Sequence, residues 1–126
     1  AAYVLAKIFL AKEDYSKAMD YYREAIDTEL DPDKRADLNY QLAFIINARL
    51  NQPVRAREYA LEAIKLRPAW GDPYILIGDM YASSKDCFED EFEKATIYWA
   101  AVDKFIKAKS VDPESAEKAN ERISTY

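Results

Sequence analysis

The chain has 126 residues, a formal net charge of −5 at pH 7, no His and one Cys. Without His it cannot build a Ser-His-Asp or Cys-His catalytic arrangement, nor a metal site with imidazole ligands. The negative charge counts against a nucleic-acid partner, whose phosphates need clustered Lys and Arg, and no apolar run approaches the roughly 20 residues that span a bilayer.

Helix caps and the spacing of apolar residues predict seven helices joined by short turns. The predicted helices span residues 1–12, 15–28, 32–49, 53–67, 73–84, 90–110 and 113–124. Asp-Pro pairs open the third, fifth and seventh helices, at Asp31, Asp72 and Asp112. Asp caps the free N–H groups of a first turn, and Pro fits the first helical position, where no intrahelical hydrogen bond is lost.

Small residues recur at fixed offsets along the predicted helices, with large apolar residues between them. A side chain larger than Ala would overpack a close helix crossing, at a cost of about 1–3 kcal/mol. We therefore expect three pairs of helices that cross closely. The first helices of the pairs carry Ala6, Ala43 and Gly78, and the second helices carry Ala18, Ala56 and Ala101.

The third copy of this pattern is the clearest, and it reads Tyr74-x2-Ile77-Gly78-x2-Tyr81, then Ala101-x3-Phe105-x2-Ala108, then Pro113. It resembles the tetratricopeptide repeat (TPR) family, in which an aromatic residue, Leu-Gly, Ala-x3-Phe and Pro recur about every 34 residues. The resemblance implies an all-α, right-handed superhelix of three TPR-like helix pairs plus a terminal helix. The repeats of this single array would be residues 1–30, 31–69 and 70–112, followed by the helix at 113–124.

Two repeats depart from the length of the first. From Leu42 to Ala56 there are 14 residues, one more than the 13 from Leu5 to Ala18. From Ile77 to Ala101 there are 24, which implies an insertion of 11 residues near 83–94. Asp90 and Glu93 form a capping-box pattern, so we expect the insertion to be a loop that feeds a long sixth helix. That helix would carry an apolar stripe of Phe92, Ala95, Trp99, Val102 and Ile106.

The insertion contains the single Cys, Cys87, among acidic residues. An activated thiol is one hypothesis, but neighbouring carboxylates would raise the thiol pKa and disfavour the reactive thiolate. A calcium site is another hypothesis, but the run lacks the spacing and the Gly of an EF-hand loop. We favour an inert Cys in a solvated, helix-capping acidic loop, and we predict no catalytic residue, metal or cofactor.

In the TPR family, ligand contacts come mostly from the first helix of each pair, on the side that faces away from its partner helix. The resemblance carries these positions over to Tyr3, Lys7, Asp37, Tyr40, Phe44, Asn47, Asp72, Ile75 and Asp79, with Leu10 and Ala82 beside them. Aromatic anchors edged by carboxylates predict an apolar or aromatic ligand with basic flanks, and Asp72 would repel a carboxylate. The alternative is that some of these side chains, Phe44 above all, pack between neighbouring helices.

The resemblance thus implies a non-catalytic protein–protein interaction module that binds a peptide or protein segment on its concave face, as a monomer or weak dimer. The alternative is a structural scaffold that orients neighbouring domains or self-associates, with its groove filled by its own chain. An open apolar groove would favour the first function, and a self-filled groove the second.

Neither end of the sequence has the polar capping helix that a helical array needs, so we expect a piece of a longer protein. The stretches 78–87 and 98–105 are similar to long TPR proteins of Bacteroidetes-type bacteria, many of which carry an export signal. This similarity allows for export to the bacterial cell envelope or periplasm, without direct insertion into a membrane.

Overall fold

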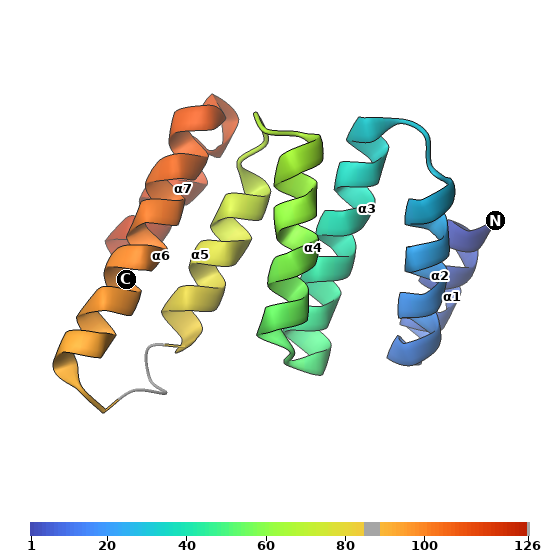
Figure 1. Cartoon of the computed structure of the whole chain (residues 1–126), viewed down its shortest axis with the longest axis horizontal. Helices are drawn as coiled ribbons and strands as arrows, with labels where there is room; N and C mark the ends of the chain where they lie inside the picture. The colour runs from blue at the N-terminus through green and yellow to red at the C-terminus, as the bar shows by residue number, and fades with distance from the viewer. Residues whose placement is uncertain (85–88, 126) are drawn as a thin grey trace. The chain divides into compact units, whose positions relative to one another are not determined.

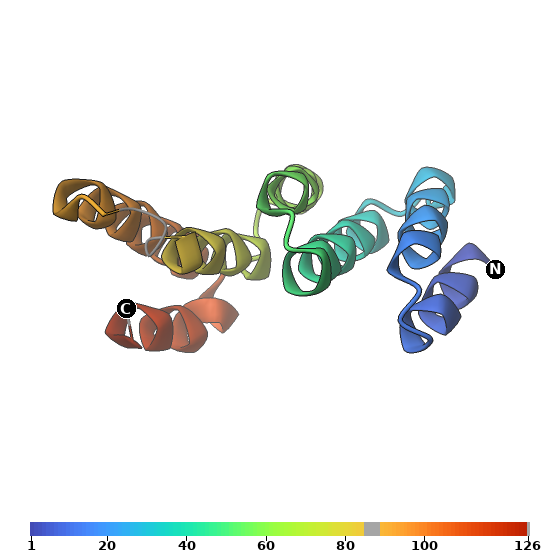
Figure 2. The same cartoon turned by 90° about the horizontal axis from the view of Figure 1, so that it is seen from below.

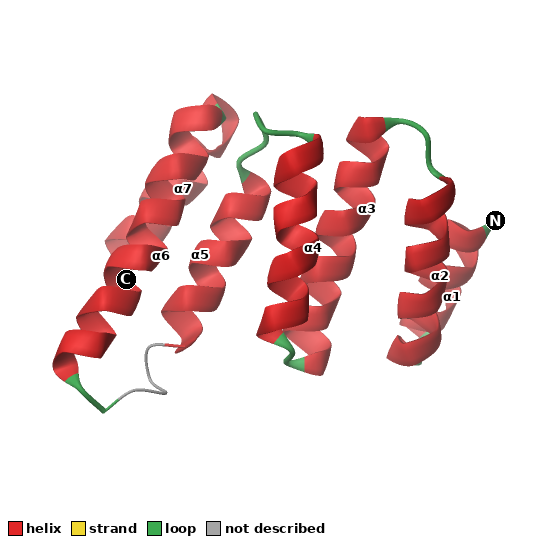
Figure 3. Ribbon diagram, viewed as in Figure 1, coloured by secondary structure: helices red, strands yellow, loops and turns green. Residues whose placement is uncertain are grey.

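The computed structural model describes residues 1–84 and 89–125. Within these ranges the chain forms seven α-helices and no strand, which confirms the predicted all-α class (Figure 1 and Figure 3). None of the helices in these ranges combines the length and the apolar character needed to cross a membrane. The hypotheses about Cys87 and the middle of the insertion lie outside the described residues.

The α-helices are, in chain order, α1 (Ala2–Ala11), α2 (Tyr15–Thr28), α3 (Pro32–Ile45), α4 (Pro53–Leu66), α5 (Asp72–Ser84), α6 (Glu91–Val111) and α7 (Ala116–Thr125). A five-residue π-helix, η1 (Ile46–Leu50), follows α3, and a 3-10 turn, η3 (Pro113–Ser115), precedes α7. The chain divides into two compact units, Ala1–Arg67 with α1 to α4 and Pro68–Tyr126 with α5 to α7. A single continuous array stays a prediction.

Aspartate side chains cap two helices where the sequence predicts caps. The Asp31 carboxylate accepts from the Asp33 N–H at 3.0 Å, and the Asp90 carboxylate accepts from the Phe92 N–H at 2.8 Å. These bonds satisfy N–H groups of a first turn, which have no partner within the helix. The long sixth helix therefore begins at Glu91, as the insertion and the Asp90 cap predict.

Asp72 lies inside the first turn of α5, so the predicted cap at this position is wrong. The reason is that Gly71 already supplies the carbonyl that accepts the first hydrogen bond of the helix. Asp112 does cap the turn before α7, because its Oδ1 accepts from the Glu114 N–H at 3.1 Å. Its Oδ2 accepts from the Gly71 N–H and the Ser115 hydroxyl, both at 3.0 Å. One carboxylate thus joins the start of α5 to the start of α7.

The predicted helix 32–49 is α-helical over its first 14 residues and then continues as the π-helix η1. A π turn holds one more residue than an α turn, which accommodates the extra residue between Leu42 and Ala56. The turn ends at Asn51 in the left-handed conformation, at φ 51° and ψ 48°, which Asn adopts more readily than most residues. α4 then packs along α3 with Ala56 fully buried.

The small residues lie where the two helices of a pair approach most closely. At Gly78 a Cβ atom would lie 2.5 Å from Cε1 of Phe105, so no side chain fits there unless this buried ring moves. The predicted close crossings are therefore confirmed. The fully buried alanines at the crossings are Ala6, Ala18, Ala43, Ala56 and Ala101.

Helix α7 packs along α6, pairs with α5 through the Lys118 and Arg122 side chains, and completes the core of the second unit (Figure 2). Its Ala119 is fully buried in a cluster with Ile75 of α5 and Phe105 of α6. A Cβ atom at Gly71 would lie 2.6 Å from the Ser115 Cβ, so the turn before α7 rests directly on the residue before α5. The second unit is therefore a three-helix body with α7 as an integral part.

We expect Ala101→Leu to lower the free energy of unfolding by about 1–3 kcal/mol, because the added atoms have no space at a fully buried helix crossing. Ala100→Leu is the matched control, since Ala100 is the neighbouring residue on α6 and is partly exposed. Its effect should stay within about 0.5 kcal/mol. Urea unfolding followed by circular dichroism measures both variants, and equal midpoints would contradict a close crossing at Ala101.

Candidate functional site

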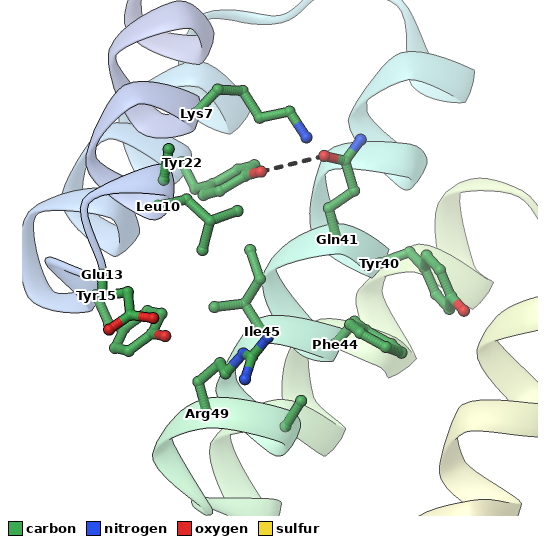
Figure 4. Close-up of a pocket in the computed structure, with 12 residues that line it drawn as sticks. Lys7, Leu10, Glu13, Tyr15, Tyr22, Tyr40, Gln41, Phe44, Ile45 and Arg49 are labelled. Carbon is green, nitrogen blue, oxygen red and sulfur yellow. Dashed lines mark hydrogen bonds between the residues drawn. The ribbon is translucent and has the colours of Figure 1, made fainter.

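The first unit contains an open pocket between α1, α2 and α3, with a volume of about 470 Å³ (Figure 4). Ligand-binding clefts typically measure about 300–1,000 Å³. Leu10 of α1 and Ile45 of α3 point toward each other in this pocket, and Phe44 lies beside Ile45 (Figure 4). The pocket therefore has an apolar wall on both of the first helices of this unit.

On α3, Gln41 and Ile45 point toward α1, whereas the rings of Tyr40 and Phe44 point away from it at the edge of the pocket (Figure 4). Lys7 and Leu10 are three residues apart, and Tyr40 and Phe44 are four apart, so each pair shares one helix face. The rings of Tyr40 and Phe44 lie 6.5 Å apart in a tilted arrangement. Phe44 keeps 52% of its surface exposed, so it is not packed away between helices and offers apolar area to a ligand.

A hydrogen-bond network around Gln41 links α1, α2 and α3 at one end of the pocket. The hydroxyls of Tyr3 and Tyr22 donate to Gln41 Oε1 at 3.3 and 3.2 Å, and Gln41 Nε2 donates to Asp37 at 2.8 Å. Burial raises the pKa of Tyr22 to about 12, and Tyr3 and Asp37 add to this effect. Tyr22 therefore remains a protonated donor at neutral pH, and the network holds α3 at a set distance from the first helix pair.

Charged side chains border the pocket. Lys7 comes from α1 and Arg49 from η1, and Figure 4 shows them at opposite ends of the pocket. The Lys7 ammonium also lies 5.7 Å from the centre of the Tyr3 ring, in a cation–π contact. Glu13, in the turn between α1 and α2, adds one carboxylate. Across residues 1–84 and 89–125, no group of three or more acidic or Cys side chains is placed to hold a metal ion.

In the second unit, the carboxylates expected at the site are paired with α7. Asp72 binds the Lys118 ammonium at 3.3 Å, and Asp79 binds Nε of Arg122 at 3.0 Å. Burial raises the pKa of Asp79 above its ordinary value, although Arg122 and Lys118 lower it. Desolvation of this carboxylate thus has a larger effect on its pKa than the ion pair with Arg122 does. Neither carboxylate presents an uncompensated negative charge to a ligand.

Ile75 and Ala82 belong to the core of the second unit, which corrects the expectation that they face a ligand. Each keeps only 4% of its surface exposed, and both pack in the cluster that contains Phe105 and Ala119. The physical reason is that α6 and α7 together close this core against α5. An isolated α5 would leave Ile75 and Ala82 accessible, whereas the packed second unit buries both side chains.

The structure brings Lys7, Tyr40 and Phe44 together at one pocket, with Leu10 beside them. Tyr3 and Asp37 lie at its end within the Gln41 network, and the partly exposed Asn47 does not line it.

Sequence reasoning missed Gln41 and Arg49 as residues of the site. A polar residue four positions after Asp37 on the same helix face was an available signal for Gln41. No signal indicated Arg49, because its place at the pocket depends on the π-helix η1.

Residues 1–33 match a family model described as tetratricopeptide repeat. The match covers α1, α2 and the turn into α3, and both α1 and α2 line the pocket. No curated protein matches the chain significantly. The match and the described helices together support an all-α, TPR-like helical repeat, and TPR repeats generally mediate protein–protein interaction without catalysis.

Replacing Tyr22 by Phe should alter how stability depends on alkaline pH. Because the pKa of Tyr22 is raised from 10.0 to about 12, the folded state holds this proton more tightly, and its contribution is complete below pH 10. Up to about 3 kcal/mol of stability should be lost between pH 10 and 12 in the wild type. Tyr22→Phe should remove this part of the loss, while Tyr21→Phe on the same helix should retain it. Urea unfolding at several pH values measures the stability of the three proteins. Identical dependence of stability on pH in all three would contradict a buried Tyr22 phenol.

Removing Arg122 and removing Asp79 should lower the free energy of unfolding by different amounts. Arg122→Met leaves a largely buried carboxylate without its counter-charge and should cost about 1 kcal/mol at neutral pH, since the pair is partly solvated. Asp79→Asn should cost less, because burial disfavours the charge that it removes. The loss in Arg122→Met should shrink as the pH falls and Asp79 takes up a proton. A larger loss for Asp79→Asn than for Arg122→Met in urea unfolding would contradict this order.

Proposed function

We propose that the first unit binds a partner protein segment, which inserts an apolar or aromatic side chain into the pocket between α1 and α3. The observation that carries the proposal is the open pocket, with Leu10 and Ile45 inside it and the half-exposed Phe44 at its wall. Burial of one large apolar side chain contributes about 1.5–3 kcal/mol. Such an anchor is sufficient for a reversible protein–protein contact when flanking residues add to it.

The hydrogen-bond network supports a pocket that exists before the ligand arrives. Gln41 of α3 is held by Tyr3 of α1 and Tyr22 of α2, so three helices share one polar contact. Tyr22 is fully buried there, and its ring lies 6.1 Å from that of Tyr3 in an edge-on arrangement. A preformed site reduces the conformational entropy lost on binding.

The charges around the pocket favour an acidic flank on the ligand rather than the basic flank expected from the sequence. That expectation rested on three carboxylates, of which Asp72 and Asp79 are paired with cations of α7, whereas Asp37 accepts from the neutral Gln41 amide. The side chains that line the pocket include one carboxylate, Glu13, and two cations. Lys7 and Arg49 border the pocket at its two ends. A carboxylate beside the apolar anchor would be attracted to either cation, mainly raising the rate of association.

A structural role is the second candidate, and one observation in the second unit favours it. There α7 covers Ile75 and pairs with Asp72 and Asp79, so the chain itself fills the positions at which a ligand was expected. We infer that this unit orients neighbouring parts of the protein, while the first unit binds the partner. Export to a bacterial cell envelope stays a prediction from the sequence.

An array of random synthetic peptides probed with the purified chain tests the proposal, with fluorescence polarisation to measure the affinity of hits. We expect hits that carry an aromatic or large aliphatic residue next to Asp or Glu. Phe44→Ala should weaken their binding about tenfold or more, because it removes apolar area from the pocket wall. Lys7→Gln and Arg49→Gln should each weaken binding modestly and reduce its dependence on salt.

Phe92→Ala is the matched control, because Phe92 is an exposed aromatic residue of α6 that does not line the pocket. It should leave the affinity of the hits unchanged. Hits that bind Phe44→Ala with full affinity would contradict the pocket as the binding site. A consistent preference for peptides with Lys or Arg flanks would contradict the proposed ligand charge.

A further inference from the structure

One face of α6 is apolar and exposed, although the helix already buries another face against α5. The buried face includes Ala101 and Phe105. On the exposed face, Phe92, Trp99 and Ile106 keep 74%, 65% and 47% of their surfaces accessible. A row of large apolar side chains at the surface marks an interaction site more often than a scatter of single ones does.

The exposed row is symmetric about Trp99. Phe92 precedes Trp99 by seven residues and Ile106 follows it by seven, so all three share one helix face with a drift of only about 20° per heptad. When two α6 helices lie antiparallel with Trp99 against Trp99, Phe92 of each copy lies opposite Ile106 of the other. A two-fold axis thus pairs the whole row with itself, as a symmetric dimer interface requires.

The charges at the two ends of α6 favour the same antiparallel orientation. Glu91 and Glu93 lie in its first turn, and Lys107 and Lys109 lie near its end. Glu91 and Lys109 are 18 residues apart, or about five full turns, so both lie on the same side of the exposed row. Two-fold symmetry brings this side of each helix together, with Glu91 of one copy near Lys109 of the other. In a symmetric parallel pair, Glu91 of the two copies would lie at one level on opposite sides of the exposed row, and neither would reach Lys109 of the other copy.

Glu91 and Lys109 each have a partner within the chain, and breaking either contact should lower the stability of the protein little. Glu91 pairs with Lys94 at 3.6 Å while its side chain is 89% exposed, and Lys109 donates to Asn120 at 2.9 Å on the surface. Exposed pairs of this kind contribute little to stability. They do not hold either end of α6 away from a second copy.

We propose that two copies of this chain associate through α6, packed antiparallel with Trp99 of each copy at the two-fold axis. The surface belongs to the second unit and shares no residue with the pocket, so the association is independent of peptide binding. One helix pair forms a small interface, below about 1,200 Å², and such interfaces associate weakly. The dimer is therefore reversible and depends on concentration.

Sedimentation equilibrium of the full chain, from low micromolar to near-millimolar concentration, tests the proposal. We expect a monomer–dimer equilibrium that Trp99→Glu weakens by about tenfold or more, because it places two charges at the centre of the interface. Val54→Glu is the matched control, since Val54 is 73% exposed on α4 and receives the same charge. It should leave the dimer unchanged. A monomer at all concentrations, or equal effects of the two variants, would overturn the proposal.

A charge exchange tests the orientation without changing the apolar row. Glu91→Lys alone should weaken the dimer, because it sets Lys against Lys109 of the second copy, and adding Lys109→Glu should restore it. Unchanged or tighter association of Glu91→Lys would show that Lys109 of the second copy does not lie near residue 91, and it would overturn the antiparallel arrangement. Failure of the double variant to restore the dimer would overturn it as well, and circular dichroism checks that every variant keeps its helices.

Discussion

Each helix pair depends on one constraint, namely that the two backbones approach so closely that only Ala or Gly fits at the crossing. The contact between Gly78 and the Phe105 ring shows this constraint directly, because a single Cβ atom would lie 2.5 Å from that ring. Around the crossings, large side chains such as Tyr22 and Leu42 become fully buried. The close approach therefore sets the geometry on which the core of each unit depends, and the sites on the first helices inherit that geometry.

The two units use different interactions between successive first helices, and this difference leaves an open pocket beside α1 and α3 while α7 closes the core of the second unit. In the first unit, the neutral Gln41 network and the bulky Tyr22 ring lie between α1 and α3, with a pocket beside them. In the second unit, the small Ala119 lets α7 settle onto α5 and α6, and the ion pair of Asp79 with Arg122 adds to this contact. Equivalent positions of the predicted repeats thus line an open pocket in one unit and pack against α7 in the other.

Most of the helices could be predicted from the sequence, because caps such as Asp31 and Asp90 and the repeated small residues act over a few neighbouring positions. The candidate site could be predicted only in part. Lys7, Tyr40 and Phe44 follow from helix periodicity, whereas the burial of Ile75 depends on α7, which lies more than 40 positions further along the chain. The position of Arg49 at the pocket depends on a π turn. The sequence shows that this repeat has one extra residue, but it does not show where along the helix that residue is accommodated. Caps and helix periodicity predict individual helices, but they do not predict contacts between helices that are distant in the sequence.

The π-helix η1 has a consequence for how such repeats diverge in evolution. An extra residue within a regular helix rotates every later side chain by about 100° about the helix axis and would misalign the next helix of the pair. Here the surplus residue is absorbed within Ile46–Leu50, and α4 still presents its buried alanines to α3. The same turn carries Arg49 at the pocket. Length variation at this turn can therefore change which side chains line the pocket while leaving the helix pairing intact, so that the pocket and the stability of the helix pair are free to evolve separately.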